Sequence, residues 1–588
     1  MISKPTAPTA NVPSDSIPPL TDFDFSINDI IKTIDSIPRY SAMGPDRVPP
    51  ILLKECKQEL APALQIMWRK SLDSGEIPKI YLQQSIIPIY KKSGRAMAAN
   101  YRPISLTSQI IKLFERMLRV KLVEHLETYR LLSDNQHGFR RGRSCLTNLL
   151  HHLDSIISIL EENNNADVVY IDMSKAFDKV NHHTLLYKLS QMGIGGKILK
   201  WIDSFLSGRY QQVVINGVSS EPAKVLSGVP QGTVLGPVLF IAYMNDICSV
   251  IKHSIIRIFA DDSKIIKSIR NPADREKLIE DLHAILTWAK NNSMELNIDK
   301  YQLLQHGLND DLRHPYQLNG DIEIKNSSPV KDLGVLITDN LSTRDHILKI
   351  TSEAKAMAAW TLRTFESRDR FTMLRLLKTY IIPRVEYSSP CWSPYLIKDI
   401  TLLESVQRSY TAQIDSMDDL DYWQRLEKLK LFSLQRRRER FIIIHCHKIY
   451  SGLAPNDVGL EFKNHPRFGL LCKRQPLKSK NAKIRTIRHN FFSDVAPRLF
   501  NIIPAQVKAV TGTEKFKEAL DKVLINIPDK PPIAGYPSQN HNSLTELVSC
   551  LREEEKKMRW KIDETMTSTP PVAVQQLAAL SDGSKRNR

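Results

Sequence analysis

The chain has 588 residues, 42% hydrophobic and 25% charged, which is the composition of a globular protein too long for one compact core. Lysine and arginine outnumber aspartate and glutamate by 82 to 64, so the formal net charge of +18 favours an anionic partner such as nucleic acid, although an ordinary basic surface would look the same. No apolar run approaches a signal peptide or a membrane span, and the seven cysteines show no paired spacing, so we expect a soluble intracellular protein without disulfides.

The N-terminal part begins with a stretch rich in proline, serine and threonine, which predicts a disordered tail over residues 1–20. Beyond it, apolar residues recur at helical spacing, and a β-branched run follows. These patterns predict helices at 27–37, 51–72, 110–126 and 146–160, and a strand at 85–90.

Between residues 167 and 336, short β-rich runs alternate with helical segments, as an α+β domain requires. Helical spacing returns afterwards and predicts helices at 347–364, 372–380 and 401–413. The basic run from Arg436 to Arg440 opens a later helix. It suits either a grip on a phosphate backbone or a solvated helical face.

An acidic pair, Asp261-Asp262, lies between two runs of β-branched residues, which predicts a tight strand-turn-strand with both carboxylates at its tip. Adjacent carboxylates repel each other unless a cation lies between them, yet a lone Asp-Asp is more often a solvated turn. Asp172 ends the apolar run 168–171, and a strand there would bring it beside the hairpin. Three such acids can share two Mg²⁺ ions.

A turn rich in glycine and proline lies between Asp172 and the acidic pair, and it leads into an apolar run. In motif order, spacing and flanking residues, the chain resembles the reverse transcriptases of non-LTR (LINE-type), jockey-like retrotransposons. The segments that carry this resemblance are 44–46, 100–106, 136–140, 172–180, 227–237, 259–262 and 330–335.

The resemblance implies an α+β, right-hand polymerase fold with fingers, palm, a helical thumb and a basic C-terminal extension. We therefore expect an N-terminal extension with fingers at 21–90, reverse transcriptase fingers and palm at 91–338, a helical thumb at 339–460, a basic region at 461–565 and a second disordered tail at 566–588.

The resemblance also implies a two-metal site. Asp172 and Asp261 would bridge two Mg²⁺ ions, for which Mn²⁺ can substitute, and Asp262 would be the third acid. The backbone carbonyl of Met173 would complete the shell. Met173 itself departs from the more usual Phe or Leu, and Thr233 from the more usual Ser, and neither change should abolish the chemistry.

Five further residues are expected to contact the nucleotide, and a sixth to act as a proton donor. Phe177 would close the sugar pocket against a 2′-hydroxyl, although a core aromatic is the alternative; Gln231 would contact the nucleotide or the template. Arg102 and either Lys91 or Lys92 would neutralise the triphosphate. Lys300 matches the position proposed to protonate the leaving pyrophosphate, with a solvated lysine as its rival.

The expected function is an RNA-directed DNA polymerase that adds deoxynucleotides to a primer 3′-hydroxyl on an RNA template. The expected partners are an RNA template, a DNA primer or target, deoxynucleoside triphosphates and a separate endonuclease, because no endonuclease-like region fits before the polymerase motifs. The family implies work at nuclear DNA. The alternative is a truncated or decayed retroelement copy that acts at most as a nucleic-acid-binding protein.

Overall fold

The computed structural model describes residues 17–91, 94–307, 309–318, 322–465, 469–474, 479 and 481–533. These residues form two compact units. The first combines helices with two sheets, and the second combines helices with one β-hairpin. The first unit contains the chain up to His346, the segment Gly452–Gly459 and the described part of Pro476–His489. The second contains Ile347–Ser451 and most of the described chain beyond residue 459. Residues 1–16 of the first predicted tail, the whole second tail 566–588 and the C-terminal part of the predicted basic region lie outside the described residues. The prediction of disorder is wrong for residues 17–20, because Ile17 is buried and Leu20 N donates to Gly193 O at 2.8 Å.

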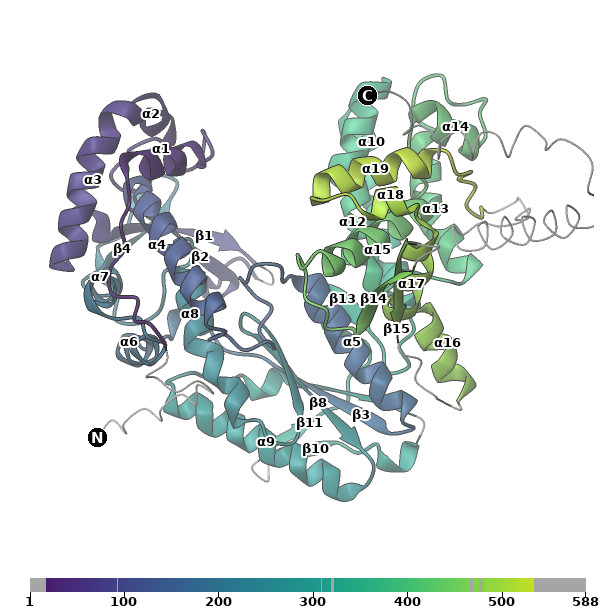
Figure 1. Ribbon diagram of the computed structural model, residues 1–588, viewed down its shortest axis with the longest axis horizontal. Helices are drawn as coiled ribbons and strands as arrows, with labels where there is room; N and C mark the ends of the chain where they lie inside the picture. The colour runs from purple at the N-terminus through teal and green to yellow at the C-terminus, as the bar shows by residue number, and fades with distance from the viewer. Residues whose placement is uncertain are drawn as a thin grey trace, which may run out of the picture. The chain divides into compact units, whose positions relative to one another are not determined.

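The central sheet of the first unit has four antiparallel strands in the order β7-β8-β3-β9. Its strands are β3 (Asn165–Ile171), β7 (Ile255–Phe259), β8 (Asp262–Ile269) and β9 (Gln302–His306). Each of β3, β7 and β8 contains three β-branched residues, which pack well on a pleated surface. Nearly every residue of β3 and β8 is buried, so both faces of the sheet are covered. Helix α5 contacts β3, β7 and β8, and α9 contacts β8. Figure 1 shows α5 beside β3.

A second sheet in this unit has the order β2-β1-β4-β5, with β6 paired to β4. Its strands are β1 (Gln83–Tyr90), β2 (Tyr101–Leu106), β4 (Tyr210–Ile215), β5 (Val218–Ser219) and β6 (Ala223–Lys224). Strand β1 runs antiparallel to β2 and parallel to β4. Two small antiparallel hairpins complete the strands of the unit, namely β10 (Tyr316–Leu318) with β11 (Ile322–Ile324), and β12 (Val330–Asp332) with β13 (Val335–Ile337).

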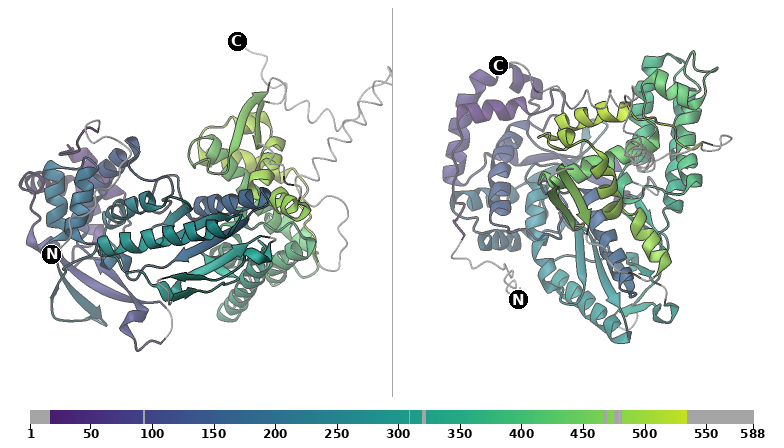
Figure 2. Two further views of the ribbon diagram at one scale, coloured as in Figure 1. Left: turned by 90° about the horizontal axis from the view of Figure 1, so that it is seen from below. Right: turned by 45° about the vertical axis from the view of Figure 1, so that its right-hand side comes forward.

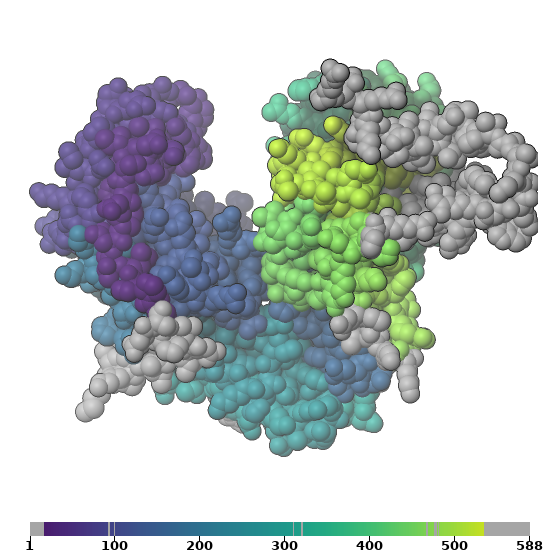
Figure 3. Space-filling model, in the orientation of Figure 1, coloured from purple at the N-terminus to yellow at the C-terminus, as the bar shows by residue number. Residues whose placement is uncertain are grey.

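The helices of the first unit pack beside these sheets, while β5 and β6 of the second sheet stay exposed (Figure 2). These helices are α1 (Ile27–Asp35), α2 (Pro50–Glu55), α3 (Lys57–Ser74), α4 (Gln109–Thr128), α5 (Cys145–Glu161), α6 (His182–Gln191), α7 (Gly196–Leu206), α8 (Gly236–Met244), α9 (Pro272–Asn291) and most of α16 (Ala482–Asn490). The single helix predicted over 51–72 is interrupted at Cys56, whose backbone leaves the helical region. Around Phe114 an aromatic core joins α3, α4 and α7, with Trp68 and Trp201 packed on its ring. The purple helices α1–α3 cover part of the surface of this unit (Figure 3).

The second unit is mainly helical. It contains most of α10 (Arg344–Thr364), α11 (Arg370–Leu376), a π-helical turn (Leu377–Ile381), α12 (Ile382–Glu386), α13 (Ile397–Thr411), α14 (Tyr422–Leu429), α15 (Leu434–Tyr450), α17 (Phe492–Ile502), α18 (Ala505–Lys508), α19 (Thr513–Ile525) and the hairpin of β14 (Leu460–His465) with β15 (Gly469–Arg474). None of the helices in the described chain is both long and apolar enough to cross a membrane.

The basic run on α15 corrects one prediction. Arg436 and Arg438 are buried, with 2% and 1% of their surface exposed. Arg437 forms an ion pair with Glu386, and Arg440 forms one with an aspartate of α19. The run is therefore not a solvated helical face, and Arg436 and Arg438 are too deeply buried to grip a phosphate backbone.

Candidate active site

The structure brings the three predicted carboxylates together at one end of the central sheet. Strand β3 pairs with β8 so that Ile171 lies opposite Ser263. Asp172 follows Ile171 and Asp262 precedes Ser263, so the two acids lie just beyond this last pair, and both line the same pocket. Asp261 belongs to the two-residue turn between β7 and β8, because Phe259 pairs with Asp262 across it. The predicted strand-turn-strand and its neighbouring strand are confirmed.

Burial and neighbouring negative charge both act on the acidic pair Asp261-Asp262. Burial raises the pKa of Asp261, and the negative charge of Asp172 raises it further, while Lys91 and Arg102 act to lower it. Burial and the neighbouring charge of Asp261 raise the pKa of Asp262 to about 6, although its side chain still reaches solvent on one side. Repulsion of this kind favours a bound cation, which would stabilise all three ionised groups.

The donor set fits a hard divalent cation. Carboxylate and carbonyl oxygens are the ligands that Mg²⁺ and Mn²⁺ prefer. The backbone on either side of Met173 is anchored by a neighbouring segment, since Ser174 N donates to Glu295 O at 2.8 Å and Asn297 N donates to Asp172 O at 2.9 Å. Asp172 and Met173 therefore have a rigid backbone behind them.

Lys300 lies beside the acids. Its Nζ is 3.0 Å from Asp172 Oδ2, and the two side chains are 63% and 41% exposed. An exposed ion pair of this kind contributes only about 0–1 kcal/mol, so Lys300 is free to move away from Asp172. Both residues line a pocket of about 210 Å³, together with Asp262 and the buried ion pair of Lys264 with Asp332.

The glycine-proline turn approaches two other backbone segments very closely. Gly228 has φ +89°, and a Cβ there would lie 2.8 Å from the backbone of Asp178. Gly232 has φ +115°, and a Cβ there would lie 2.6 Å from Ser105 O. Between them, Gln231 Nε2 donates to Asp178 Oδ1 at 3.1 Å. Both glycines thus allow a close approach of backbone segments that a Cβ would prevent.

Phe177 is half-buried between aromatic neighbours. Its ring stacks on Phe240 of α8, with centroids 4.0 Å apart and an interplanar angle of 12°, and Phe139 meets it edge-on at 6.3 Å. The ring is thus held in a fixed orientation while part of it stays accessible.

The predicted triphosphate-binding cations lie on the β1–β2 hairpin. Lys91 directly follows β1, and Arg102 is on β2; both are exposed. Both act on the pKa of Asp261, so the structure places them within electrostatic range of the acids. Lys92 lies outside the described residues.

Glu115 of α4 also supports this site, although the sequence interpretation did not identify it. Its side chain is fully buried, and Oε2 accepts hydrogen bonds from Val234 N at 2.7 Å and Leu235 N at 3.0 Å. These bonds join α4 to the turn that carries Gln231 and leads into α8. One signal was present: Glu115 falls on the apolar stripe of its helix, between Ile111 and Leu118, where a charged residue needs a buried partner.

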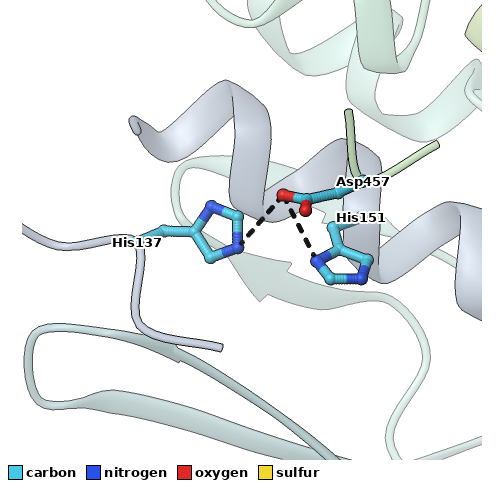
Figure 4. A group of neighbouring side chains, drawn as sticks. All are labelled: His137, His151 and Asp457. Atoms are coloured by element: carbon cyan, nitrogen blue, oxygen red, sulfur yellow. Dashed lines mark ion pairs between the residues drawn. The ribbon is translucent and has the colours of Figure 1, made fainter. Parts of the chain in front are cut away.

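A second group of residues of metal-binding type consists of His137, His151 and Asp457 (Figure 4). Both histidines point toward Asp457, whose Oδ2 lies 3.8 Å from His137 Nε2 and 3.5 Å from His151 Nδ1. Arg257 Nη2 is 2.7 Å from His151 Nε2, so Nε2 accepts and the ring proton is on Nδ1, facing the carboxylate. Arg143 Nη1 lies 3.5 Å from Asp457 Oδ2.

Positive charge is therefore already supplied to this cluster by two guanidinium groups. Burial and these arginines lower the pKa of His137 to about 2 and that of His151 to about 3. A divalent cation placed there would be repelled by Arg143 and Arg257, and it would displace the contact of Arg143 with Asp457. The cluster is an ion-pair network that joins the segment Gly452–Gly459 to α5, within the first unit.

Comparison with known proteins identifies the class of this site. Residues 89–337, which contain every predicted site residue, match the family model of reverse transcriptase (RNA-dependent DNA polymerase). The match to this family therefore covers about two fifths of the chain.

Within that class, the chain is similar to the polymerases of non-LTR retrotransposons from Drosophila melanogaster. It is 27% identical to the probable RNA-directed DNA polymerase from transposon X-element over 56% of this chain and 37% of that protein. It is 28% identical to the corresponding protein from transposon BS, and 25% identical to the RNA-directed DNA polymerase from mobile element jockey, each over 62% of this chain and 41% of the relative. The predicted jockey-like resemblance is confirmed, and the chain spans about two fifths of the length of these curated relatives.

Proposed function

We propose that this chain is an RNA-directed DNA polymerase of a non-LTR retrotransposon, which adds deoxynucleotides to a primer 3′-hydroxyl on an RNA template. The observation that carries the proposal is the convergence of Asp172, Asp261 and Asp262 at the adjoining ends of β3 and β8, inside the reverse transcriptase domain. In the right-hand arrangement that such an enzyme requires, the first unit supplies fingers and palm. Helices α10–α15 of the second unit supply the thumb.

The three aspartates and the carbonyl of Met173 would hold two Mg²⁺ or Mn²⁺ ions. When bound, these ions neutralise the triphosphate and favour ionisation of the attacking hydroxyl. The aspartates must be ionised to do this, and the cations Lys91 and Arg102 favour that state at Asp261. The same two cations, with Lys92 as a further candidate, suit the phosphates of the incoming nucleotide.

The remaining side chains select and orient the substrate. Phe177, held against Phe240, blocks the space that a 2′-hydroxyl would need. Gln231, fixed by Asp178, contacts the incoming nucleotide or the template. Lys300 exchanges its exposed partner Asp172 for the leaving pyrophosphate and donates a proton to it.

The proposed partners follow from this reaction: an RNA template, a DNA primer or target, and deoxynucleoside triphosphates. The net charge of +18 favours binding to RNA and to DNA, which are both polyanions. A separate endonuclease would provide the primer end at the target, and nuclear DNA is the target that the family suggests.

The test is primer extension by the purified chain on an RNA template with a DNA primer, deoxynucleotides and Mg²⁺. Asp261→Asn removes one carboxylate of the site. Asp419→Asn is the matched control, because Asp418-Asp419 is also an acidic pair but lies exposed in a turn of the second unit.

DNA product from the wild type and Asp419→Asn, but not from Asp261→Asn, supports the proposal. Equal product from all three proteins contradicts the site. Absence of product from a folded, RNA-binding wild type favours the alternative, a decayed copy that only binds nucleic acid.

A further inference from the structure

The turn that carries the acidic pair is held in an unfavourable backbone conformation. Ala260, which precedes Asp261, has φ +58°. A left-handed conformation costs a residue with a Cβ roughly 1–2 kcal/mol and persists only where the surroundings enforce it. Asp261 follows directly, so the direction of its carboxylate depends on this dihedral angle.

The side chain of Gln136 holds this residue at both ends. Its Oε1 accepts a hydrogen bond from Ala260 N at 3.0 Å, and its Nε2 donates to Ala260 O at 3.4 Å. Oε1 also accepts from Gly138 N at 2.7 Å, which fixes the orientation of the carboxamide. Gln136 is 2% exposed, so it has no direct access to a substrate.

The backbone around Gln136 is itself attached to the catalytic hairpin. Ile258 N donates to Asn135 O at 3.0 Å, and His137 N donates to Ile258 O at 2.9 Å, which extends β7 by one parallel bridge. Gly138 packs so closely that a Cβ there would lie 2.4 Å from Ala260 N. The Gln136 side chain therefore cannot shift without moving the turn.

We propose that Gln136 is a positioning residue for Asp261: it holds Ala260 in the left-handed conformation and thereby sets the carboxylate in the direction that metal binding and catalysis require. A carboxamide suits this task because it supplies an acceptor for the peptide N–H and a donor for the peptide C=O. The expected effect on primer extension rests on the proposed polymerase function, whereas the expected effects on backbone exchange and Mn²⁺ binding do not.

The test compares the wild type with Gln136→Met, which keeps the volume and loses all three hydrogen bonds. Amide hydrogen exchange of the metal-free protein should show Ala260 exchanging about 10-fold faster, as expected for one lost hydrogen bond. Mn²⁺ affinity, followed by electron paramagnetic resonance without turnover, should weaken about 10-fold. Single-turnover extension should slow by roughly 10²-fold, the effect of misplacing a catalytic group by about 1 Å.

Two further variants separate positioning from a general loss of stability. Gln109→Met removes another buried glutamine of the same unit, whose Nε2 donates to Ala42 O at 2.5 Å, and should leave Mn²⁺ affinity and extension unchanged. Ala260→Gly in the Gln136→Met background should restore part of the loss, because glycine adopts positive φ without strain.

Faster Ala260 exchange with wild-type Mn²⁺ affinity, or no restoration by Ala260→Gly, would overturn the inference. If Gln136→Met fails to fold, Gln136→Glu replaces it: a carboxylate still accepts from both N–H groups, but it loses the donor and adds a negative charge close to Asp261. This variant is judged on Ala260 exchange, which should be faster than in the wild type; an unchanged exchange rate would also overturn the inference. A wild type that extends no primer would contradict the proposed function alone, because exchange and Mn²⁺ binding still test Gln136.

Discussion

Replacing Glu115 by alanine should destabilise the turn that carries Gln231. The Glu115 carboxylate is fully buried and accepts hydrogen bonds from the backbone N–H groups of Val234 and Leu235. Leu235 is the N-cap residue of α8, so these bonds also satisfy donors at the start of that helix. Alanine removes the acceptor and admits no other protein group in its place.

The size of the effect follows from the two bonds. A hydrogen bond to a charged group contributes about 1.5–3 kcal/mol, and a buried N–H left without a partner costs about 1–3 kcal/mol. Burial raises the pKa of Glu115 and so disfavours its ionised form. The loss of stability on removing the carboxylate should therefore lie toward the lower end of the sum of these contributions. We therefore expect the free energy of unfolding to fall by about 2–5 kcal/mol. Local exchange at Val234 and Leu235 should become about 10- to 100-fold faster.

The assay is urea denaturation combined with amide hydrogen exchange of residues 234–235. Glu124→Ala is the matched control, because Glu124 is on the same helix but is 59% exposed and pairs with Lys121 at the surface. This control should cost no more than about 0.5–1 kcal/mol. Glu115→Ala would refute the reasoning if it were no less stable than Glu124→Ala and if residues 234–235 exchanged at the wild-type rate.

Three other substitutions test separate parts of the structure. Phe177→Val should admit ribonucleotides while extension with deoxynucleotides persists, and unchanged sugar discrimination in competition assays would refute its proposed role. Gly232→Ala should lower extension by at least about 10-fold, because the Cβ meets Ser105 O at 2.6 Å at positive φ; normal extension by this variant would show that the turn can relax. Arg488 binds the carboxylate of Glu161 at 2.8 and 3.0 Å, and Arg488→Met removes this buried partner. The free energy of unfolding should fall by about 3–5 kcal/mol. A melting temperature equal to that of the wild type would contradict this.

The parts of the fold that local pattern controls were predictable. The β-branched runs around the acidic pair form β7 and β8, and the apolar run before Asp172 forms β3. Apolar spacing located α4 and α5 to within about two residues, since a period of 3.6 residues is visible in the chain itself. The break at Cys56 was missed, because the apolar stripe continues across it.

Side-chain contacts between residues distant in sequence were not predictable in the same way. The run from Arg436 to Arg440 looks like an exposed basic patch, yet its arginines are buried or paired with acids distant in sequence. Asp457 follows helices of the second unit in sequence, but it belongs to the first unit, where it meets His137 and His151. Such contacts depend on which surfaces meet after the elements form, and a single sequence does not encode them in any local period.

The sequence by itself determined the acids, their order, the glycines of the turn and the class of chemistry, because each of these is a matter of residue type and short spacing. Only the tertiary structure decided that Asp172 and Asp262 line one pocket, that Glu115 anchors the turn of Gln231, and that Gln136 holds Ala260. Residues separated by some 90 to 125 positions meet in these contacts. Strand register and helix packing bring them together, and both arise from burial of the whole core rather than from any one segment.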